Sequence, residues 1–415
     1  MRDMLESLGK RLKTARERGR MADRLSRSYE CRCGAAIVLS NNECTTCNSA
    51  LGFLPDTVSL VAVDSDPVSG TVRIAGRELL YKYCGNRETP ARCNWLVEAG
   101  SSSSFCVACR LNRTIPYLGD ADNARYWAAV EVAKRRLVAQ LLSLGLPVKS
   151  KVDEDPESGL MFDFLRSPAD GPNVMTGHAS GLITLNVEEA DDARRAKIKQ
   201  DLHEPYRTLL GHFRHEVGHY YWDRLVRDTK WHEPCRELFG DENASYAEAL
   251  KRNYEQGPPA DWADSYISSY ATMHPWEDWA ETWAHYLHVV DSLGTAVGFG
   301  LNVSGLETKI SQFSRDDLYA PDDPGAENFL SLLNSWIEMI MVINELARSM
   351  GYPDFYPFDM PRPVVAKLQL VQMITLDARN ADELGMALRQ IQRSLADGIL
   401  VSSDRSFLVN KAKIA

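Results

Sequence analysis

Eight of the nine cysteines of this 415-residue chain lie between Cys31 and Cys109. The stretch around them has little helical periodicity and carries strand-like runs at 58–63 and 71–74, which is typical of a small β-rich unit. The apolar core of such a unit is thin, so the fold needs a further source of stability. Cysteines supply it either as disulfides or as metal thiolates, and the redox compartment decides between the two.

The first thirty residues contain no continuous apolar block of the kind found in a secretory signal. Close cysteine pairs in a chain without an export signal favour metal thiolates over disulfides. We therefore expect a reducing compartment, the cytoplasm. No run of about eighteen apolar residues occurs, so we also expect no transmembrane segment.

The cysteines fall into two groups of four, each with the ligand set of a structural zinc ion. The first group is Cys31, Cys33, Cys44 and Cys47, and the second is Cys84, Cys93, Cys106 and Cys109. The C-x-C pair that opens the first group is tighter than the usual C-x-x-C, and the second group has only one close pair. We expect zinc at both, with free buried thiols as the alternative at the second. Cys235 stands apart and is expected to be an ordinary packed side chain.

The net charge of −10 is unevenly distributed along the chain. Residues 1–120 hold 17 Lys and Arg against 13 Asp and Glu, a balance of +4, which leaves −14 for residues 121–415. Each four-thiolate zinc site adds −2, so two sites cancel the positive balance. The remaining basic character is confined to residues 1–28, and nucleic acid is therefore a disfavoured partner.

The sequence divides into four regions that differ in composition and in hydrophobic periodicity. Together they predict an α+β fold. They are a basic helical arm at 1–28, the zinc-ribbon region at 29–120, a mainly helical domain at 121–360 and a helical extension at 361–415. Long helical stretches are expected at about 190–228, 275–292 and 326–350. The segment 240–272 is rich in Tyr, Asn, Gly and Pro and is expected to be irregular or broken helix.

The sequence His215-Glu216-Val217-Gly218-His219 lies in the first of these helical stretches. Two histidines four residues apart project from one helical face and can meet a single cation. Glu216 lies one step around the helix, beside the open coordination position. Zinc lowers the pKa of a water that it binds to about 7, and a glutamate so placed can accept the proton. We therefore predict zinc at His215 and His219, with Glu216 as general base.

A third ligand is needed, and a metzincin would place glycine and then histidine or aspartate where this chain has Trp222 and Leu225. The better candidate is a helix expected to begin at Pro275. Glu277 and Glu281 share one face of it, among tryptophans that imply burial, and like charges at this spacing repel unless a cation joins them. We predict Glu277 as ligand and Glu281 as the carboxylate behind a ligand histidine. Spacing alone leaves Glu281 and Asp278 as alternatives.

Two further parts of the site are expected. Tyr270, shortly before the ligand helix, is the first candidate to stabilise a developing oxyanion, with His285 and Tyr220 behind it. The short β-prone run 181–186 would let an extended peptide add as a neighbouring strand. The substrate-binding residues predicted there are Leu182, Ile183 and Thr184. The alternative is a strand buried within its sheet.

Over residues 29–365 the chain resembles a bacterial family of zinc-binding metallopeptidases with an N-terminal zinc ribbon. The motifs that carry the resemblance are Tyr83-Cys84, Arg92-Cys93-Asn94-Trp95-Leu96, Cys106 to Asn112, Glu204 to Asp223 and Glu277-Asp278-Trp279-Ala280-Glu281. Glu277-x-x-x-Glu281 is also similar to the ligand helix of gluzincins related to anthrax lethal factor, which place a tyrosine shortly upstream. The resemblance implies a zincin fold for the helical domain and Glu277 as ligand. The C-x-C pair and residues from about 366 onward depart from the family pattern.

Three functions are consistent with these features. The first is a zinc-dependent metallopeptidase that acts on a peptide or protein, with the zinc-ribbon region as a partner or substrate adaptor. The second is a zinc-ribbon regulatory or nucleic-acid-binding protein with a vestigial peptidase domain. The third is a zinc hydrolase of a non-peptide amide. Because His215, Glu216 and His219 are all intact, the first is preferred.

Overall fold

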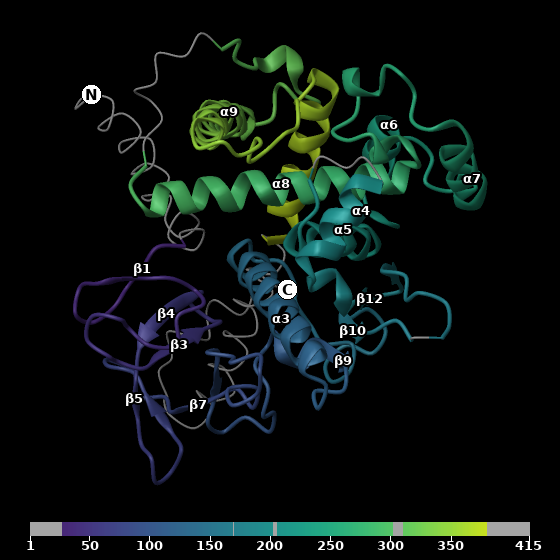
Figure 1. Ribbon diagram of the computed structural model, residues 1–415. Coiled ribbons are helices and arrows are strands. Elements are labelled where there is room, and N and C mark those ends of the chain that lie inside the picture. Colours follow the sequence, from purple (N-terminus) through teal and green to yellow (C-terminus); the bar gives the residue numbers. More distant parts are fainter. Residues whose placement is uncertain (1–26, 169, 202–205, 302–309, 380–415) are drawn as a thin grey trace, which may run out of the picture.

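A computed structural model describes residues 27–168, 170–201, 206–301 and 310–379 (Figure 1). Nearly all of the basic arm predicted at 1–28 and the end of the extension predicted at 361–415 lie outside these residues. Residues 362–379 of the extension are helical. The α+β prediction is confirmed: a cysteine-bearing region of short strands precedes a mainly helical region.

The cysteine-rich region is built from short antiparallel strands joined by turns. Strands β3 (Leu51–Leu54) and β4 (Ser59–Ala62) form a hairpin, and Phe53 of β3 packs on Trp95 with ring centroids 4.3 Å apart. The other strands are β1 (Tyr29–Glu30) paired with β2 (Ala36–Ile37), and the four-stranded sheet of β5 (Asp64–Ser65), β6 (Val72–Arg73), β7 (Tyr81–Tyr83) and β8 (Leu96–Glu98). No strand of the cysteine-rich region exceeds four residues, as expected for a fold that depends on its metal sites.

A second four-stranded sheet opens the helical region, in the order β11-β12-β10-β9. Its strands are β9 (Asn112–Thr114), β10 (Met161–Leu165), β11 (Gly177–Ala179) and β12 (Leu182–Asn186). Strand β12 pairs with β10 in parallel and with β11 in antiparallel register, so each of Leu182, Ile183 and Thr184 has a neighbour on both sides. The prediction that a peptide adds to these three residues is therefore wrong, because their backbone groups already belong to ladders within the sheet. The edge strands of this sheet are β11 and β9.

The helices place the predicted site residues on two crossing elements. The first long helix is α3 (Ala121–Ser143), and α8 (Pro275–Gly298) crosses the molecule with α5 (Leu209–Tyr221) packed against it (Figure 1). A β-carbon on Gly218 would lie 3.0 Å from the α-carbon of Ala280, so glycine permits the close approach of α5 to α8. The indole N–H of Trp279 donates to the carbonyl of Gly218 at 2.8 Å and fixes the crossing.

The prediction of one continuous helix at 190–228 is wrong in detail. Helix α4 (Asp192–Asp201) and α5 are separate, because Thr208 adopts extended backbone angles and caps α5 by accepting a hydrogen bond from the Gly211 N–H. A π-helical turn, η3 (Trp222–Val226), then ends the segment. The irregular segment predicted at 240–272 contains a regular helix, α7 (Tyr246–Gln256), capped by Ser245. Helix α6 (His232–Phe239) precedes it.

Helix α9 (Ala326–Ser349) matches its predicted range closely. Within the described residues it alone is long and apolar enough to cross a membrane, with a mean hydropathy of 1.3. Only 28% of that window is buried, although Phe329, Leu333 and Trp336 pack inward. Buried core helices meet the same criteria, so this one helix is only weak evidence for a transmembrane segment. The absence of a transmembrane segment stays a prediction.

Candidate metal centre

The two histidines of α5 and the first-turn glutamate of α8 converge on one point. The Nε2 atoms of His215 and His219 lie 3.2 Å apart, and Glu277 Oε2 lies 3.0 Å from the first and 3.5 Å from the second. A tetrahedral zinc site with ligand bonds of about 2.0–2.2 Å places its nitrogen and oxygen ligands about 3.3 Å apart. The three side chains therefore have the spacing of a zinc ligand set.

The chemistry of the donor atoms also fits a cation. Glu277 Oε2 is buried and has no hydrogen-bond partner among the described residues. Burial by itself would raise the pKa of Glu277, but the His219 and His215 imidazoles outweigh it and hold that pKa well below its usual range. A buried, ionised and unpaired carboxylate oxygen is costly unless a cation meets it. A divalent metal ion bound by the three ligand atoms removes this cost.

The neighbouring carboxylates of α8 take other partners. His215 Nδ1 donates to Glu281 Oε1 at 2.6 Å, and the Ser268 hydroxyl donates to Glu281 Oε2 at 2.6 Å. This contact leaves His215 Nε2 as the nitrogen with a lone pair. Asp278 lies 2.6 Å from Lys367 Nζ, away from the histidines. Of the three carboxylates considered from the sequence, only Glu277 is thus brought beside both Nε2 atoms.

The contact between Glu281 and His215 predicts the effect of a single substitution. Glu281→Gln is expected to lower zinc affinity at this centre by about 10–100-fold, because the amide holds the imidazole less firmly and makes it a weaker base. Competition with a chromophoric chelator measures the affinity. Glu338→Gln, at a partly exposed position of α9 whose partner is Gln312, is the matched control, and equal affinities of the two variants would contradict a supporting role for Glu281.

Glu216 belongs to a buried hydrogen-bonded chain that was not foreseen from the sequence. Its Oε1 lies 3.3 Å from His212 Nε2, and His212 Nδ1 lies 2.6 Å from Glu189 Oε2. Burial alone would lower the pKa of His212, but the Glu189 and Glu216 carboxylates raise it to about 9. The Oε2 atom of Glu216 is buried without a partner among the described residues. His212 could have been noticed, since it precedes Glu216 by one helical turn.

The pair of His212 and Glu189 predicts a pH dependence of stability. The raised pKa of His212 means that its contribution is complete below about pH 6.5 and is lost as the pH rises through about 9. Burial would raise the pKa of Glu189, but His212 lowers it to about 2, so its contribution is complete above about pH 4.5 and is lost as the pH falls through 2. Glu189→Gln is expected to cost about 2 kcal/mol of unfolding free energy near pH 5.5, the range of a hydrogen bond between charged groups. Urea denaturation at pH 5.5 and 9.5 tests this, and a cost that does not shrink at the higher pH would contradict it.

The three residues considered as oxyanion donors lie in different environments. The Tyr270 ring centroid is 5.9 Å from that of His215, and the side chain is 38% exposed. Burial of the hydroxyl, followed by the Glu277 charge, raises the pKa of Tyr270, so the phenol is protonated. Tyr220 donates to the carbonyl of Ser158, and His285 is hydrogen-bonded to Tyr356. Only Tyr270 therefore lies beside the histidine ligands.

Two further side chains at the centre escaped sequence reasoning. The Tyr246 hydroxyl of α7 donates to Glu277 Oε1 at 2.9 Å, which holds the ligand carboxylate from its other oxygen. His178 of β11 has its ring centroid 6.2 Å from that of His219. Its Nε2 accepts from the Gly181 N–H, so Nδ1 carries the hydrogen and has no partner within the described ranges. Burial and then His219 lower the pKa of His178 to about 4, so the ring is neutral.

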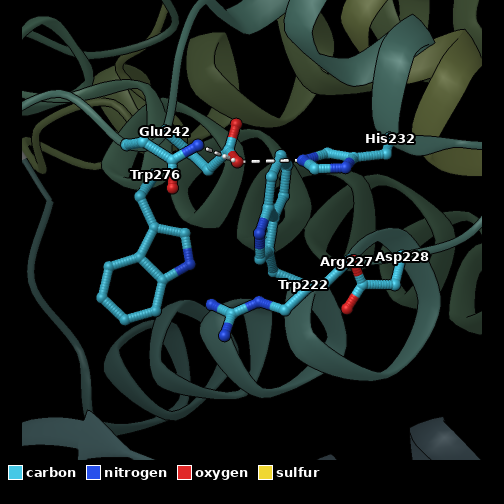
Figure 2. Close-up of a pocket in the computed structure, with 7 residues that line it drawn as sticks. Trp222, Arg227, Asp228, His232, Glu242 and Trp276 are labelled. Carbon is cyan, nitrogen blue, oxygen red and sulfur yellow. Dashed lines mark hydrogen bonds and ion pairs between the residues drawn. The ribbon is translucent and has the colours of Figure 1, made fainter.

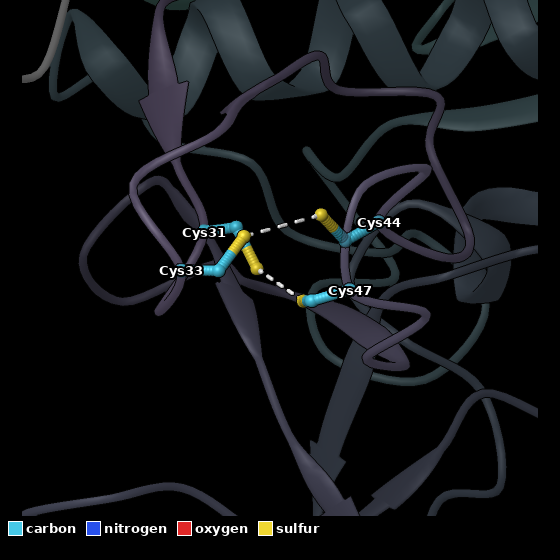
Figure 3. A group of neighbouring side chains, drawn as sticks. All are labelled: Cys31, Cys33, Cys44 and Cys47. Atoms are coloured by element: carbon cyan, nitrogen blue, oxygen red, sulfur yellow. Dashed lines mark hydrogen bonds between the residues drawn. The ribbon is translucent and has the colours of Figure 1, made fainter.

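The cysteines form the two predicted groups. In the first, Cys31 Sγ lies 3.6 Å from Cys47 Sγ and Cys33 Sγ lies 3.8 Å from Cys44 Sγ (Figure 3). In the second, Cys93 Sγ lies 3.8 Å from the sulfurs of both Cys106 and Cys109, and Cys84 completes the group. Sulfur ligands at about 2.3 Å from a tetrahedral zinc ion are about 3.8 Å apart. The tight C-x-C pair therefore does not prevent tetrahedral spacing. Cys235 is buried outside both groups.

Two family models match the chain. Residues 123–374 match the family described as "Putative zinc-binding metallo-peptidase", and residues 28–120 match a zinc-ribbon domain. A protein of Mycobacterium bovis and two of Mycobacterium tuberculosis, all described as uncharacterized, are each 40% identical to the chain over 350 residues. The match spans 84% of this chain and 95% of each relative. No solved structure matches the chain significantly.

Proposed function

Because the chain belongs to the zinc-binding metallo-peptidase family and carries its zinc-ribbon domain, we propose that it is a zinc-dependent peptidase with Glu216 as general base. The observation that carries the proposal is the convergence of His215, His219 and Glu277 on one point, with the unpartnered Glu216 Oε2 nearby on the same helix. The similarity to gluzincins stays a prediction that agrees with a glutamate in the third position.

Each residue of the centre has a proposed role. His215, His219 and Glu277 would hold a zinc ion, which would act as a Lewis acid able to lower the pKa of bound water to about 7 and to polarise a carbonyl. Glu216 accepts a proton from the attacking water and returns it to the departing amine. His212, anchored by Glu189, fixes the orientation of the Glu216 carboxylate.

The developing negative charge on the scissile carbonyl needs hydrogen-bond donors. The protonated phenol of Tyr270 and the Nδ1–H of neutral His178 both lie beside the histidine ligands, and we propose them for this role.

The substrate peptide is proposed to lie along β11. Within the described part of the chain β11 pairs with β12 alone, so its outer side offers backbone groups to an extended peptide. His178 belongs to this strand, which brings the edge next to the ligand His219. Residues 182–184 of β12 would hold β11 in place by pairing with its inner side.

We also propose a division of labour and a compartment. Residues 29–120 would serve as an adaptor for a protein partner or substrate and residues 121–360 as the catalytic domain, followed by the extension. The compartment is a reducing one such as the cytoplasm, since cysteines that are to bind zinc as thiolates must not be oxidised to disulfides.

Substrate profiling of the purified, zinc-loaded protein tests the proposed function. The protein is incubated with a diverse peptide library and with a set of non-peptide amides, and products are identified by mass spectrometry. We expect peptide cleavage that disappears in Glu216→Ala. Cleavage of non-peptide amides alone would favour an amidohydrolase, and a zinc-loaded protein that cleaves neither set would contradict the proposal.

A further inference from the structure

A pocket of about 510 Å³ adjoins the candidate metal centre (Figure 2). It lies between the turn that follows α5, the beginning of α6, the loop before α7 and the first turn of α8. Its lining residues are Trp222, Arg227, Asp228, His232, Glu242, Asn243 and Trp276. A volume of this size accommodates a side chain or a short peptide end.

The pocket is connected to the centre through Trp276. The Trp276 ring centroid lies 4.1 Å from that of the ligand His219, and Trp276 immediately precedes the ligand Glu277. Trp222 follows His219 by one helical turn. A group that fills this pocket would therefore lie close to the candidate metal centre.

The unsatisfied polar atoms of the pocket wall are hydrogen-bond donors. The Nε1 atoms of Trp222 and Trp276 are buried and have no acceptor among the described residues, and Trp222 is only 1% exposed. Figure 2 shows the two indole nitrogens facing each other across the pocket, with the Arg227 guanidinium between them and below. An indole nitrogen can donate but cannot accept, and leaving it buried without an acceptor costs about 1–3 kcal/mol.

Arg227 has N–H donors that its ion pair does not use. One of its terminal nitrogens lies 2.8 Å from Asp223 Oδ1. Within the described ranges its remaining N–H groups have no acceptor, and about half of the side chain is exposed. A guanidinium carries five N–H donors in a planar fork, so one ion pair leaves it able to bind a second oxyanion.

The carboxylates of the pocket do not offer an equivalent site for a cation. Glu242 accepts hydrogen bonds of 2.9–3.0 Å from His232, Arg236 and Asn243. Burial would raise the pKa of Glu242, but Arg236 and His232 lower it to about 2, so the carboxylate is ionised and already neutralised. Asp228 is exposed to solvent, where its attraction for a cation is screened.

We propose that this pocket binds a carboxylate of the substrate next to the cleaved bond, through the two indole N–H groups and the Arg227 guanidinium. The proposal rests on the proposed peptidase function and specifies its substrate class as acidic peptides. The carboxylate belongs either to an Asp or Glu side chain or to a free C-terminus. An acceptor with two oxygens can meet donors from both sides of the pocket at once, which a neutral apolar side chain cannot.

Matched peptides test the preference. Peptides that differ only by Glu or Gln at each position flanking the cleavage site are compared, and each is made with a free or an amidated C-terminus. We expect kcat/KM to be about tenfold or more higher for the acidic member at one position. Arg227→Gln should reduce this ratio to about two, whereas the control Arg224→Gln, which removes the ion pair between Arg224 and Asp155, should leave it unchanged. A preference that follows the free C-terminus instead identifies that carboxylate as the occupant.

A binding measurement separates this proposal from the function on which it rests. Fluorescence anisotropy of labelled Glu and Gln peptides is recorded with Glu216→Gln protein, with and without Arg227→Gln or Trp276→Phe. A preference for the Glu peptide that depends on Arg227 supports carboxylate binding in the pocket. If the unsubstituted protein cleaves no peptide, that failure counts against the peptidase function and not against the pocket. Three results would overturn the proposed carboxylate site. They are equal cleavage rates for Glu and Gln peptides, a preference for Lys or Arg peptides, and binding of no peptide at all.

Discussion

Glu216→Gln is expected to lower kcat for peptide hydrolysis by about 10³-fold while the zinc content stays the same. Glutamine has nearly the shape of glutamate, and its amide oxygen can still face His212 Nε2, 3.3 Å from the present Oε1. It cannot accept the proton that the attacking water must lose. Since the ligand atoms belong to other side chains, the metal stays bound.

Steady-state kinetics on the best library peptide, together with metal analysis of the same samples, measures both quantities. Glu248→Gln, an exposed position in the first turn of α7, is the matched control and should retain wild-type kcat. A Glu216→Gln protein with full zinc and more than about a tenth of the wild-type kcat would rule out Glu216 as the base.

Cys93→Ser is expected to have the largest effect on stability. Cys93 is completely buried, and its sulfur lies within 3.8 Å of two others in the second group. A serine hydroxyl is not deprotonated near neutral pH, so it replaces a zinc ligand poorly. Structural zinc ions contribute about 10–16 kcal/mol of apparent binding free energy in small domains, and much of this is folding free energy.

The effect should extend beyond the cysteine-rich region. Cys109 Sγ lies 3.7 Å from Glu131 of α3, and Glu131 is fully buried with Lys134 Nζ at 2.6 Å. All four cysteines of the second group belong to the same hydrophobic cluster as the apolar face of α3. Loss of this zinc site is therefore expected to unfold the ribbon and also to lower the thermal midpoint of the helical region.

Cys33→Ser provides the contrast. Cys33 is exposed, and in the first group only Cys31 and Cys44 are buried, whereas all four cysteines of the second group are buried. We expect the loss of one zinc ion with a much smaller decrease in the thermal midpoint. Zinc stoichiometry and differential scanning calorimetry of both variants measure these effects. Equal decreases for Cys33→Ser and Cys93→Ser would contradict the view that the second site joins the two regions.

The sequence alone was sufficient for features that depend on local spacing. Two histidines four residues apart must share a helical face, so His215 and His219 could be paired before any fold was known. Clustered cysteines predicted two groups, and their sulfurs lie at the spacing that tetrahedral sites require. Pro275 predicted the first residue of α8, because proline suits the first turn of a helix.

Features that depend on how elements pack could be decided only by the tertiary structure. The choice of Glu277 over Glu281 and Asp278 depends on the rotation of α8 about its axis against α5, which the Gly218 contact fixes. His178 and Tyr246 come from distant segments, and no spacing in the chain connects them to α5. The pairing of β12 on both sides, which corrected the substrate prediction, depends on contacts between strands. Short-range geometry thus determined which residues could form the centre, and long-range packing determined which of them meet.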